Sequence, residues 1–145
     1  MKKAKISPIH LVLGFVTFGN FVLLIKKDHP ADQAGKMNGI GGHVEEGESP
    51  LEAMRREATK EAGDFVGGLE WVKKGTVTYG AQVVLHCFYA DGGETPRFES
   101  KTSEKLSISP IRRLYGVNCV EDLDYLIPLC MASGLESFAL EGHRG

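Results

Sequence analysis

A short segment near the middle of the chain carries complete start and stop signals for one helix. Ser49 can cap its N-terminus, Pro50 suits the first helical position, and Glu52 completes a capping box. Gly63 marks the C-terminal end. Apolar residues recur between these signals at spacings that place a stripe against a core, namely Leu51, Met54, Ala58 and Ala62. The sequence therefore predicts an amphipathic helix that begins at Pro50 and ends at Gly63.

Two pairs of apolar segments flank this helix and have the composition of strands. Residues 10–18 are rich in β-branched and aromatic side chains, a Gly-Asn turn follows, and residues 21–27 resume the pattern, which predicts a β-hairpin. Residues 69–80 and 81–92 predict two further strands that join near Gly80. The basic start also has the outline of a secretory signal, but polar residues and glycines interrupt the apolar run. The run is too broken to span a membrane.

The remaining segments are predicted from their local composition. Residues 28–39 and 92–105 lack apolar periodicity and are predicted to be loops. Residues 120–134 resemble a closing helix with Gly134 just past its end, and Pro128 should kink or divide that helix. Three residues of the strand segments are interpreted as core residues: His10, Trp71 and His86.

Composition limits the partners and the compartment. The chain is 42% apolar and 25% charged with a net charge of -2, so it carries no large field of one sign, and long nucleic acids are not expected partners. Its three cysteines lack the spacing of a disulfide framework or a zinc site, which favours a reducing cytoplasm. No repeat or linker divides residues 1–145, so one domain is predicted. A monomer and a homodimer both stay open.

Two carboxylates on the predicted helix raise the question of a metal ion. Glu57 and Glu61 are four residues apart, so their like charges destabilise the helix by a few tenths of a kcal/mol. Mg²⁺ would offset this repulsion, because it prefers carboxylate oxygens and keeps waters and phosphates in its other positions. The alternative is an ordinary solvated helix face. The glycines of residues 38–42, "NGIGG", favour the metal site, since glycine lets backbone groups approach a ligand closely.

The segment that begins at Gly42 resembles the Nudix box, Gly-x5-Glu-x7-Arg-Glu-U-x-Glu-Glu-x-Gly-U, in which U is a bulky aliphatic residue. The matching positions are Gly42, Glu48, Arg56, Glu57, Ala58, Glu61 and Gly63. Lys60 departs from the pattern by replacing the first glutamate of the Glu-Glu pair, Asp64 replaces an aliphatic residue, and Ala58 is smaller than usual. Together with the flanking strands and the late helix, the resemblance implies an α/β fold, the Nudix α/β/α sandwich with a mixed β-sheet.

The resemblance also implies a reaction class. Nudix enzymes hydrolyse a nucleoside diphosphate linked to another moiety, while Mg²⁺ or Mn²⁺ neutralises the phosphate oxygens. By resemblance, Glu57 and Glu61 hold the metal together with a backbone carbonyl of the Gly41–Gly42 segment, so Gly42 is counted as a metal-site residue. Metal-assisted phosphoryl chemistry needs positioning and charge stabilisation more than covalent help, which agrees with this arrangement.

Further roles follow from the same resemblance. Arg56 is expected to orient Glu48 by a charge-assisted pair. The general base stays open between Glu57, which is favoured, and Glu104. Lys60 is expected to weaken metal binding or to contact a phosphate of the substrate.

The substrate is predicted from two polar residues. Residues 37–48, "MNGIGGHVEEGE", resemble the purine triphosphate-sanitising branch, in which an asparagine at the position of Asn38 hydrogen-bonds the base. Asp122 matches the first of two base-reading acids, but Leu123 replaces the second and Val120 replaces a stacking tryptophan. We therefore expect a purine nucleoside triphosphate, with oxidised purines in question. The alternatives are an ADP-ribose or nucleoside diphosphate sugar pyrophosphatase and a module that binds nucleotides without turnover.

Overall fold

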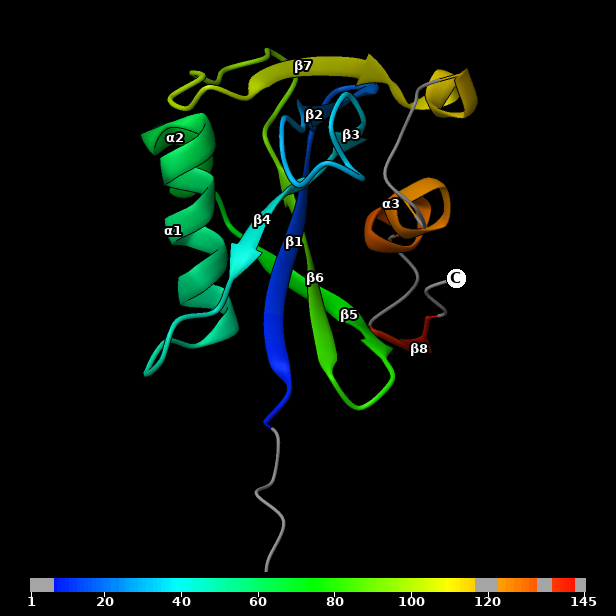
Figure 1. Cartoon of the computed structure of the whole chain (residues 1–145). Helices are drawn as coiled ribbons and strands as arrows, with labels where there is room; N and C mark the ends of the chain where they lie inside the picture. Colours follow the sequence, from blue (N-terminus) through cyan, green and yellow to red (C-terminus); the bar gives the residue numbers. More distant parts are fainter. Residues whose placement is uncertain (1–6, 117–122, 133–136, 143–145) are drawn as a thin grey trace, which may run out of the picture.

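The computed structural model describes residues 7–116, 123–132 and 137–142, which form one sheet with helices on both faces (Figure 1). The strands are β1 (Ile9–Phe18), β2 (Phe21–Lys26), β3 (Met37–Asn38), β4 (Ile40–His43), β5 (Val72–Tyr79), β6 (Val83–Asp91), β7 (Lys105–Pro110) and β8 (Phe138–Glu141). The helices are α1 (Pro50–Ala62), α2 (Asp64–Gly67) and α3 (Leu123–Met131), with a 3-10 segment at Ile111–Gly116.

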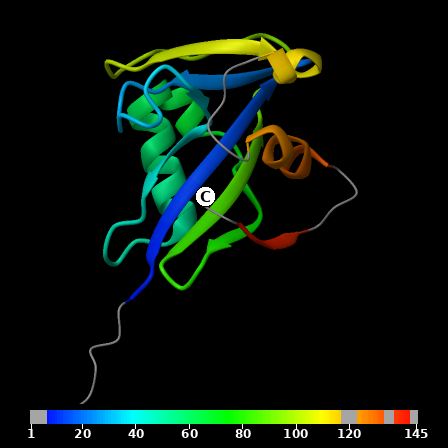
Figure 2. The ribbon, with the colours of Figure 1, turned by 45° about the vertical axis from the view of Figure 1, so that its right-hand side comes forward.

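The sheet is mixed, as predicted. Its strands follow the order β3-β2-β1-β6-β5-β8, while β4 pairs with β1 and β7 pairs with β2. The β1–β6 and β5–β8 pairs are parallel, and the other pairs are antiparallel. Along one edge of β1 the partner is β4 from Leu11 to Gly14 and β2 at Thr17 and Phe18. Figure 2 shows β2 and β7 lying across this end of β1.

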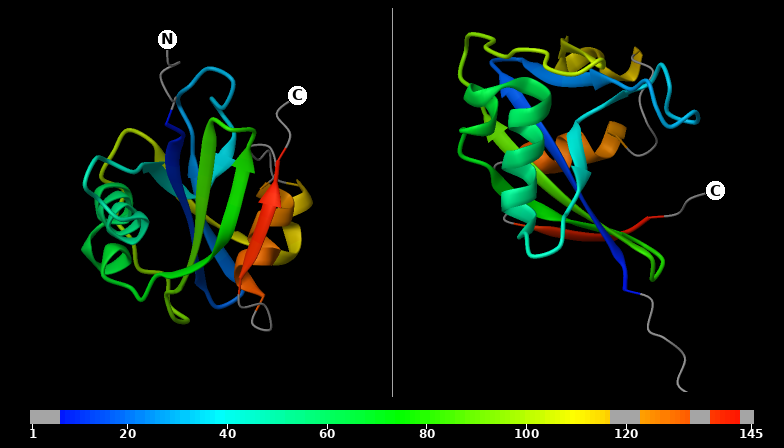
Figure 3. Two further views of the ribbon diagram at one scale, coloured as in Figure 1. Left: turned by 90° about the horizontal axis from the view of Figure 1, so that it is seen from below. Right: turned by 60° about the vertical axis from the view of Figure 1, so that its left-hand side comes forward.

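The two faces of the sheet bury separate cores, because successive strand residues point to opposite faces. On one face, Val12 and Val16 of β1 pack in a cluster with Met54 and Ala58 of α1. On the other face, Leu13 and Phe15 belong to a cluster that includes Leu126 and Ile127 of α3. Figure 3 shows α1 and α2 on one side of the sheet and α3 on the other. This is the predicted α/β/α sandwich.

Helix α1 begins and ends at the predicted residues. The Ser49 side chain accepts a hydrogen bond from the Glu52 backbone, and the Glu52 side chain accepts one from the Ser49 backbone, so the capping box is complete. Pro50 is the first helical residue. Gly63 follows the helix with φ of 96°, a conformation that other residues rarely adopt.

Several segments differ from the sequence prediction. Strand β4 and the short helix α2 were not predicted. β3 lies within the predicted loop 28–39, and β7 and β8 were not predicted. These are short strands whose partners, β2 and β5, are distant in sequence, so pairing rather than local pattern determines them. α3 continues through Pro128 and ends at Met131, while Gly134 lies outside the described residues. No helix in the described ranges is long and apolar enough to cross a membrane.

His86 is buried as predicted, whereas His10 is exposed and not a core residue. Lys73 Nζ lies 2.8 Å from His86 Nδ1, and because an ammonium only donates, Nδ1 must accept. The other nitrogen, His86 Nε2, therefore carries the proton and donates to His10 Nδ1 at 2.9 Å. Burial, and then the charges of Lys73 and His10, lower the pKa of His86 to about 4.

This depressed pKa predicts a loss of stability in mild acid. The unfolded chain takes up a proton at His86 near its ordinary pKa of 6.5, whereas the folded chain does so only near 4, so the loss occurs as the pH falls between these values. We expect about 1 kcal/mol after solvent screening is allowed for. His86→Gln keeps a donor and an acceptor without titrating. Thermal melts across this range should fall more steeply for the wild type, and parallel curves would contradict the prediction.

Candidate active site

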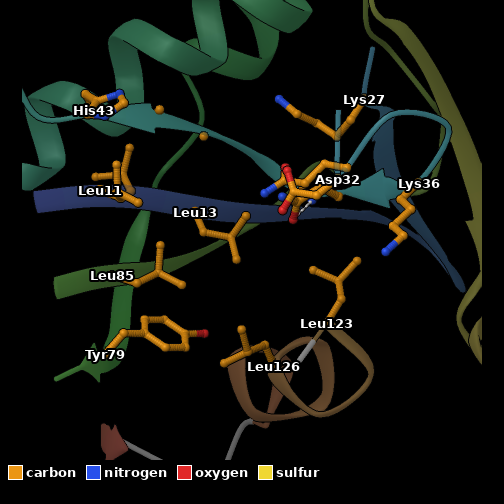
Figure 4. Close-up of a pocket in the computed structure, with 16 residues that line it drawn as sticks. Leu11, Leu13, Lys27, Asp32, Lys36, His43, Tyr79, Leu85, Leu123 and Leu126 are labelled. Carbon is orange, nitrogen blue, oxygen red and sulfur yellow. Dashed lines mark hydrogen bonds between the residues drawn. The ribbon is translucent and has the colours of Figure 1, made fainter. Parts of the chain in front are cut away.

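A pocket of about 390 Å³ opens between β1, β4 and α3. One wall is apolar and is formed by Leu11, Leu13, Leu85, Leu123, Leu126 and the ring of Tyr79. The rest is polar or backbone, with Lys27, Asp32, Lys36 and Asn38 together with the glycines of β4. Figure 4 shows Lys27, Asp32 and Lys36 at one end, His43 near the other, and the leucines between them. An apolar wall with a few polar groups is the usual lining of a small-molecule site.

Arg56 of α1 ties the helix to the loop that precedes it. Its Nε and Nη2 donate to the two oxygens of Glu48 at 2.8 and 3.0 Å, and Nη2 also donates to the His43 carbonyl at 2.9 Å. The hydrogen bond from Arg56 is the main reason that the pKa of Glu48 lies below its usual range. Such bidentate pairs fix geometry as well as contributing energy. Arg56 therefore holds the end of β4 against the helix.

Glu57 lies against the backbone of β4. Its side chain is buried, and Oε1 accepts a 2.6 Å hydrogen bond from Arg56 Nη1. A Cβ atom at Gly42 would lie only 2.6 Å from Glu57 Cδ, so this position excludes any larger residue unless the carboxylate moves. Since Gly42 also lines the pocket, Glu57 borders the pocket from behind β4. Glycine is therefore needed at position 42 because the Glu57 carboxylate packs against its backbone, and not because its φ is unusual.

Glu61 of α1 is a buried carboxylate whose pKa is strongly raised. It is only 6% exposed, and its Oε2 has no hydrogen-bond partner among the residues that the structure describes. Burial, and then the charge of Glu57, raise the pKa of Glu61 to about 8, while Lys27 and the Gly41 backbone act in the opposite direction. A buried acceptor without a partner costs about 1–3 kcal/mol. A divalent cation would satisfy this oxygen, so the carboxylates of Glu57 and Glu61 fit a Mg²⁺ or Mn²⁺ ion.

Glu104 approaches the same region from the segment before β7. It is buried, Oε1 lies 3.3 Å from Lys27 Nζ, and Oε2 accepts a 2.7 Å hydrogen bond from the Asp28 backbone. Its charge contributes to the raised pKa of Glu61, so the two carboxylates are electrostatically coupled. Asp28, His29 and Glu104 also bring ligand atoms within 4.8 Å of one another. Sequence reasoning missed Lys27, which is the last residue of a predicted strand.

The other predicted residues fall in different places. Asn38 is half-buried, lines the pocket, and its Oδ1 accepts a 2.8 Å hydrogen bond from the Gly39 backbone. Lys60 is exposed on α1 and has no ion-pair partner within the part of the chain that the structure describes. Asp122 lies outside the described residues, so its predicted role in base reading is not addressed by this geometry.

Known proteins with this architecture share its fold at low sequence identity. A NUDIX hydrolase from Nitrosomonas europaea is 16% identical with a TM-score of 0.70, covering 95% of this chain and 80% of its own. The MutT structure from work on Aliivibrio salmonicida and Vibrio cholerae is 18% identical with a TM-score of 0.67, covering 86% and 97%. The NUDIX domain of Shewanella oneidensis NrtR, complexed with ADP ribose, is 18% identical with a TM-score of 0.65, covering 85% and 86%.

Sequence comparison gives the family directly. A search of curated protein sequences found no match. The family model of the NUDIX domain, however, matches residues 8–114, which include the whole of α1 and both flanking strand pairs. Since this match spans most of the chain and the fold agrees with it, the chain belongs to the Nudix hydrolase family.

Proposed function

We propose that the protein is a Mg²⁺- or Mn²⁺-dependent pyrophosphohydrolase that cleaves a purine nucleoside triphosphate to the monophosphate and pyrophosphate. The observation that carries this proposal is the buried Oε2 of Glu61, which lacks a hydrogen-bond partner in the described ranges and lies beside Glu57 behind the Gly41–Gly42 wall of the pocket. A metal ion bound there would neutralise phosphate oxygens and lower the pKa of a bound water. The pocket would hold the nucleoside.

The chain's own residues position this chemistry. Glu57 and Glu61 would hold the metal with a backbone carbonyl of the Gly41–Gly42 segment, while Arg56 fixes Glu57 and Glu48 in place. Lys27 lines the pocket and pairs with Glu104, so its ammonium offsets part of the negative charge of the buried carboxylates. Positioning and charge stabilisation are the main requirements of this reaction class.

Glu57 is a better proposal for the general base than Glu104. Both oxygens of Glu104 are already engaged, one with the Lys27 ammonium and one with the Asp28 backbone N–H. Glu57 accepts on Oε1 alone among the described contacts. One of its oxygens is therefore available to orient a water or take its proton.

The amide of Asn38 supports a contact with the base. The Gly39 N–H needs an acceptor, so the Asn38 carbonyl oxygen faces the backbone and the NH₂ group remains a donor for the pocket. Purines offer the acceptor N7, and 6-oxopurines also offer O6. A donor at this position is therefore compatible with the proposed substrate.

Asn38→Ala is expected to lower kcat/KM for the preferred base roughly 5- to 150-fold, which corresponds to about 1–3 kcal/mol, because a base acceptor loses its partner. The kcat/KM values for poorly matched bases should fall less. Asn38→Asp is the matched variant, since it keeps the acceptor for Gly39 and replaces the donor with a second acceptor. Kinetics on purine and pyrimidine triphosphates check this. Equal losses on every base would exclude a base-reading role.

A screen of substrates tests the proposed function itself. The purified protein would be incubated with purine triphosphates, pyrimidine triphosphates and ADP-ribose, with and without Mg²⁺, and the products identified. Monophosphate and pyrophosphate from a purine triphosphate would support the proposal. The ADP ribose in the similar Shewanella oneidensis domain makes a sugar-nucleotide pyrophosphatase the second candidate, which fastest turnover of ADP-ribose would favour. Nucleotide binding without metal-dependent turnover would support a non-catalytic module.

A further inference from the structure

The polar end of the pocket carries a carboxylate whose role is not explained by the metal site. Among the described residues that line the pocket, Asp32 is the acidic one. α3, on the facing wall, contributes the leucines Leu123 and Leu126. Figure 4 shows Asp32 at the same end as Lys27 and Lys36, with Leu123 below them. Among the described residues, Asp32 is therefore the carboxylate that can accept hydrogen bonds from a ligand in this pocket.

The loop that carries Asp32, residues 27–36, is held by its own backbone. Lys27 N–H donates to the Lys36 carbonyl at 2.9 Å, and Gly35 N–H donates to the Lys27 carbonyl at 2.8 Å, which closes the neck of the loop. At the tip, two backbone N–H groups donate to the Pro30 carbonyl, at 2.9 and 3.0 Å. Gly35 has φ of 82°, which permits the return of the chain. The position of Asp32 at the pocket is therefore set by the fold.

Within the described ranges, the Asp32 carboxylate makes no hydrogen bond and no ion pair, although two lysines line the same pocket. Lys27 is paired with Glu104, and Lys36 has no ion-pair partner among these residues. The Asp32 side chain is exposed, so both of its oxygens can accept hydrogen bonds from a ligand at low desolvation cost.

We propose that Asp32 reads the hydrogen-bonding edge of the base and selects nucleotides whose base presents two adjacent donors, as guanine does. This inference rests on the proposed function of the site. Guanine carries N1–H and N2–H₂ side by side, which matches the two oxygens of one carboxylate. Adenine presents one donor next to an acceptor, and cytosine does the same, so each would leave one carboxylate oxygen facing a lone pair.

The neighbouring donors agree with this assignment. Lys36 lies at the same end of the pocket as Asp32, and Asn38, whose NH₂ group is a donor, lines the same pocket (Figure 4). Guanine has the acceptors O6 and N7 next to its donor pair, and lysine and amide groups are suitable partners for them. The apolar wall would cover the faces of the base. Donors and one acceptor group therefore line a single pocket, in the combination that a 2-amino-6-oxopurine requires.

Equilibrium binding of nucleoside monophosphates tests the proposal without relying on turnover. GMP, IMP and AMP would be titrated into the wild type, Asp32→Asn, Asp122→Asn and Glu70→Gln. Glu70 is an exposed carboxylate outside the pocket and controls for the change in net charge. We expect the wild type to bind GMP most tightly, and Asp32→Asn to weaken GMP by about 10- to 100-fold, the worth of a bidentate base contact. IMP lacks the 2-amino group, so the gap between GMP and IMP should close.

The alternatives separate cleanly. Tightest binding of AMP by the wild type, equal losses on all three nucleotides in Asp32→Asn, or loss of the guanine preference in Asp122→Asn alone would each overturn the assignment to Asp32. Turnover of triphosphates would be measured in parallel. If metal-dependent turnover is found and Asp32→Asn keeps the guanine preference, only this inference is refuted. If no turnover is found but Asp32→Asn loses the guanine preference in binding, only the hydrolase function is refuted.

Discussion

Glu57→Gln is expected to lower kcat/KM by about 100- to 10,000-fold, because the variant removes a negative charge from the metal site and the proposed base from the water. The fold should remain intact. Glutamine has nearly the same shape, so the close contact with Gly42 is kept, and its carbonyl can still accept from Arg56. Steady-state kinetics at several Mg²⁺ concentrations, with a thermal melt of the same sample, measure both effects.

Glu45→Gln is the matched control for this experiment. Glu45 also faces Arg56, at 3.7 Å, but its side chain is exposed and lies outside the buried carboxylate pair. Its loss should change kcat/KM by less than about threefold, as for a surface ion pair. Glu104→Gln completes the set and should retain more activity than Glu57→Gln. Wild-type rates for Glu57→Gln across metal concentrations would remove Glu57 from the mechanism.

Local signals account for the parts of the fold that the sequence predicted well. Helix α1 follows from Ser49, Pro50 and Glu52, which lie within four residues and satisfy one another's backbone groups. The turn between β1 and β2 follows from a Gly-Asn pair between two apolar runs. In each case the residues that determine the structure are also neighbours in the chain.

Long-range pairing explains what the sequence did not predict. β7 alternates Leu106 and Ile108 with serines, a strand pattern, but only its pairing with β2 makes the strand identifiable. His10 was interpreted as a core residue because its segment is apolar. The parallel register of β1 and β6 places it near the open end of the sheet, where it contacts the buried His86 and remains exposed.

The active-site residues divide in the same way. The box motif brings Glu48, Arg56, Glu57 and Glu61 together on one helix and its entry loop, so sequence reasoning could name them. Asp32 comes from a segment that local composition marks only as a polar loop, and Lys27 is the last residue of a predicted strand. Their place in the pocket depends on how β2, β3 and β4 pair around β1. Glu61 Oε2 lacks a hydrogen-bond partner among the described residues, and this depends on every side chain packed around it.

Glu61→Gln is expected to stabilise the metal-free protein and to abolish its stabilisation by metal. Burial and Glu57 raise the folded-state pKa of Glu61 to about 8 from 4.5. A carboxyl with a raised pKa stabilises the fold below about pH 4.5, and that contribution is lost as the pH rises to about 8. At and above that pH, the neutral amide should raise the free energy of unfolding by about 1–3 kcal/mol, because it removes an uncompensated buried charge and can donate to Glu57.

Metal binding should reverse the order of the two proteins. A cation that binds only the folded state stabilises it by RT ln(1 + [L]/Kd), which is about 2.7 kcal/mol at one hundred times Kd. The wild type should therefore gain several degrees in Tm as Mg²⁺ is added, whereas Glu61→Gln lacks a charged ligand and should gain little. Melts above about pH 8, with chelator and then with Mg²⁺, give both comparisons. Glu45→Gln should respond to Mg²⁺ as the wild type does, since that side chain is exposed. Equal increases in Tm with Mg²⁺ for the wild type and Glu61→Gln would place the metal elsewhere. A metal bound by Glu61 offsets the cost of burying that carboxylate, so removing the charge must weaken the Mg²⁺ response.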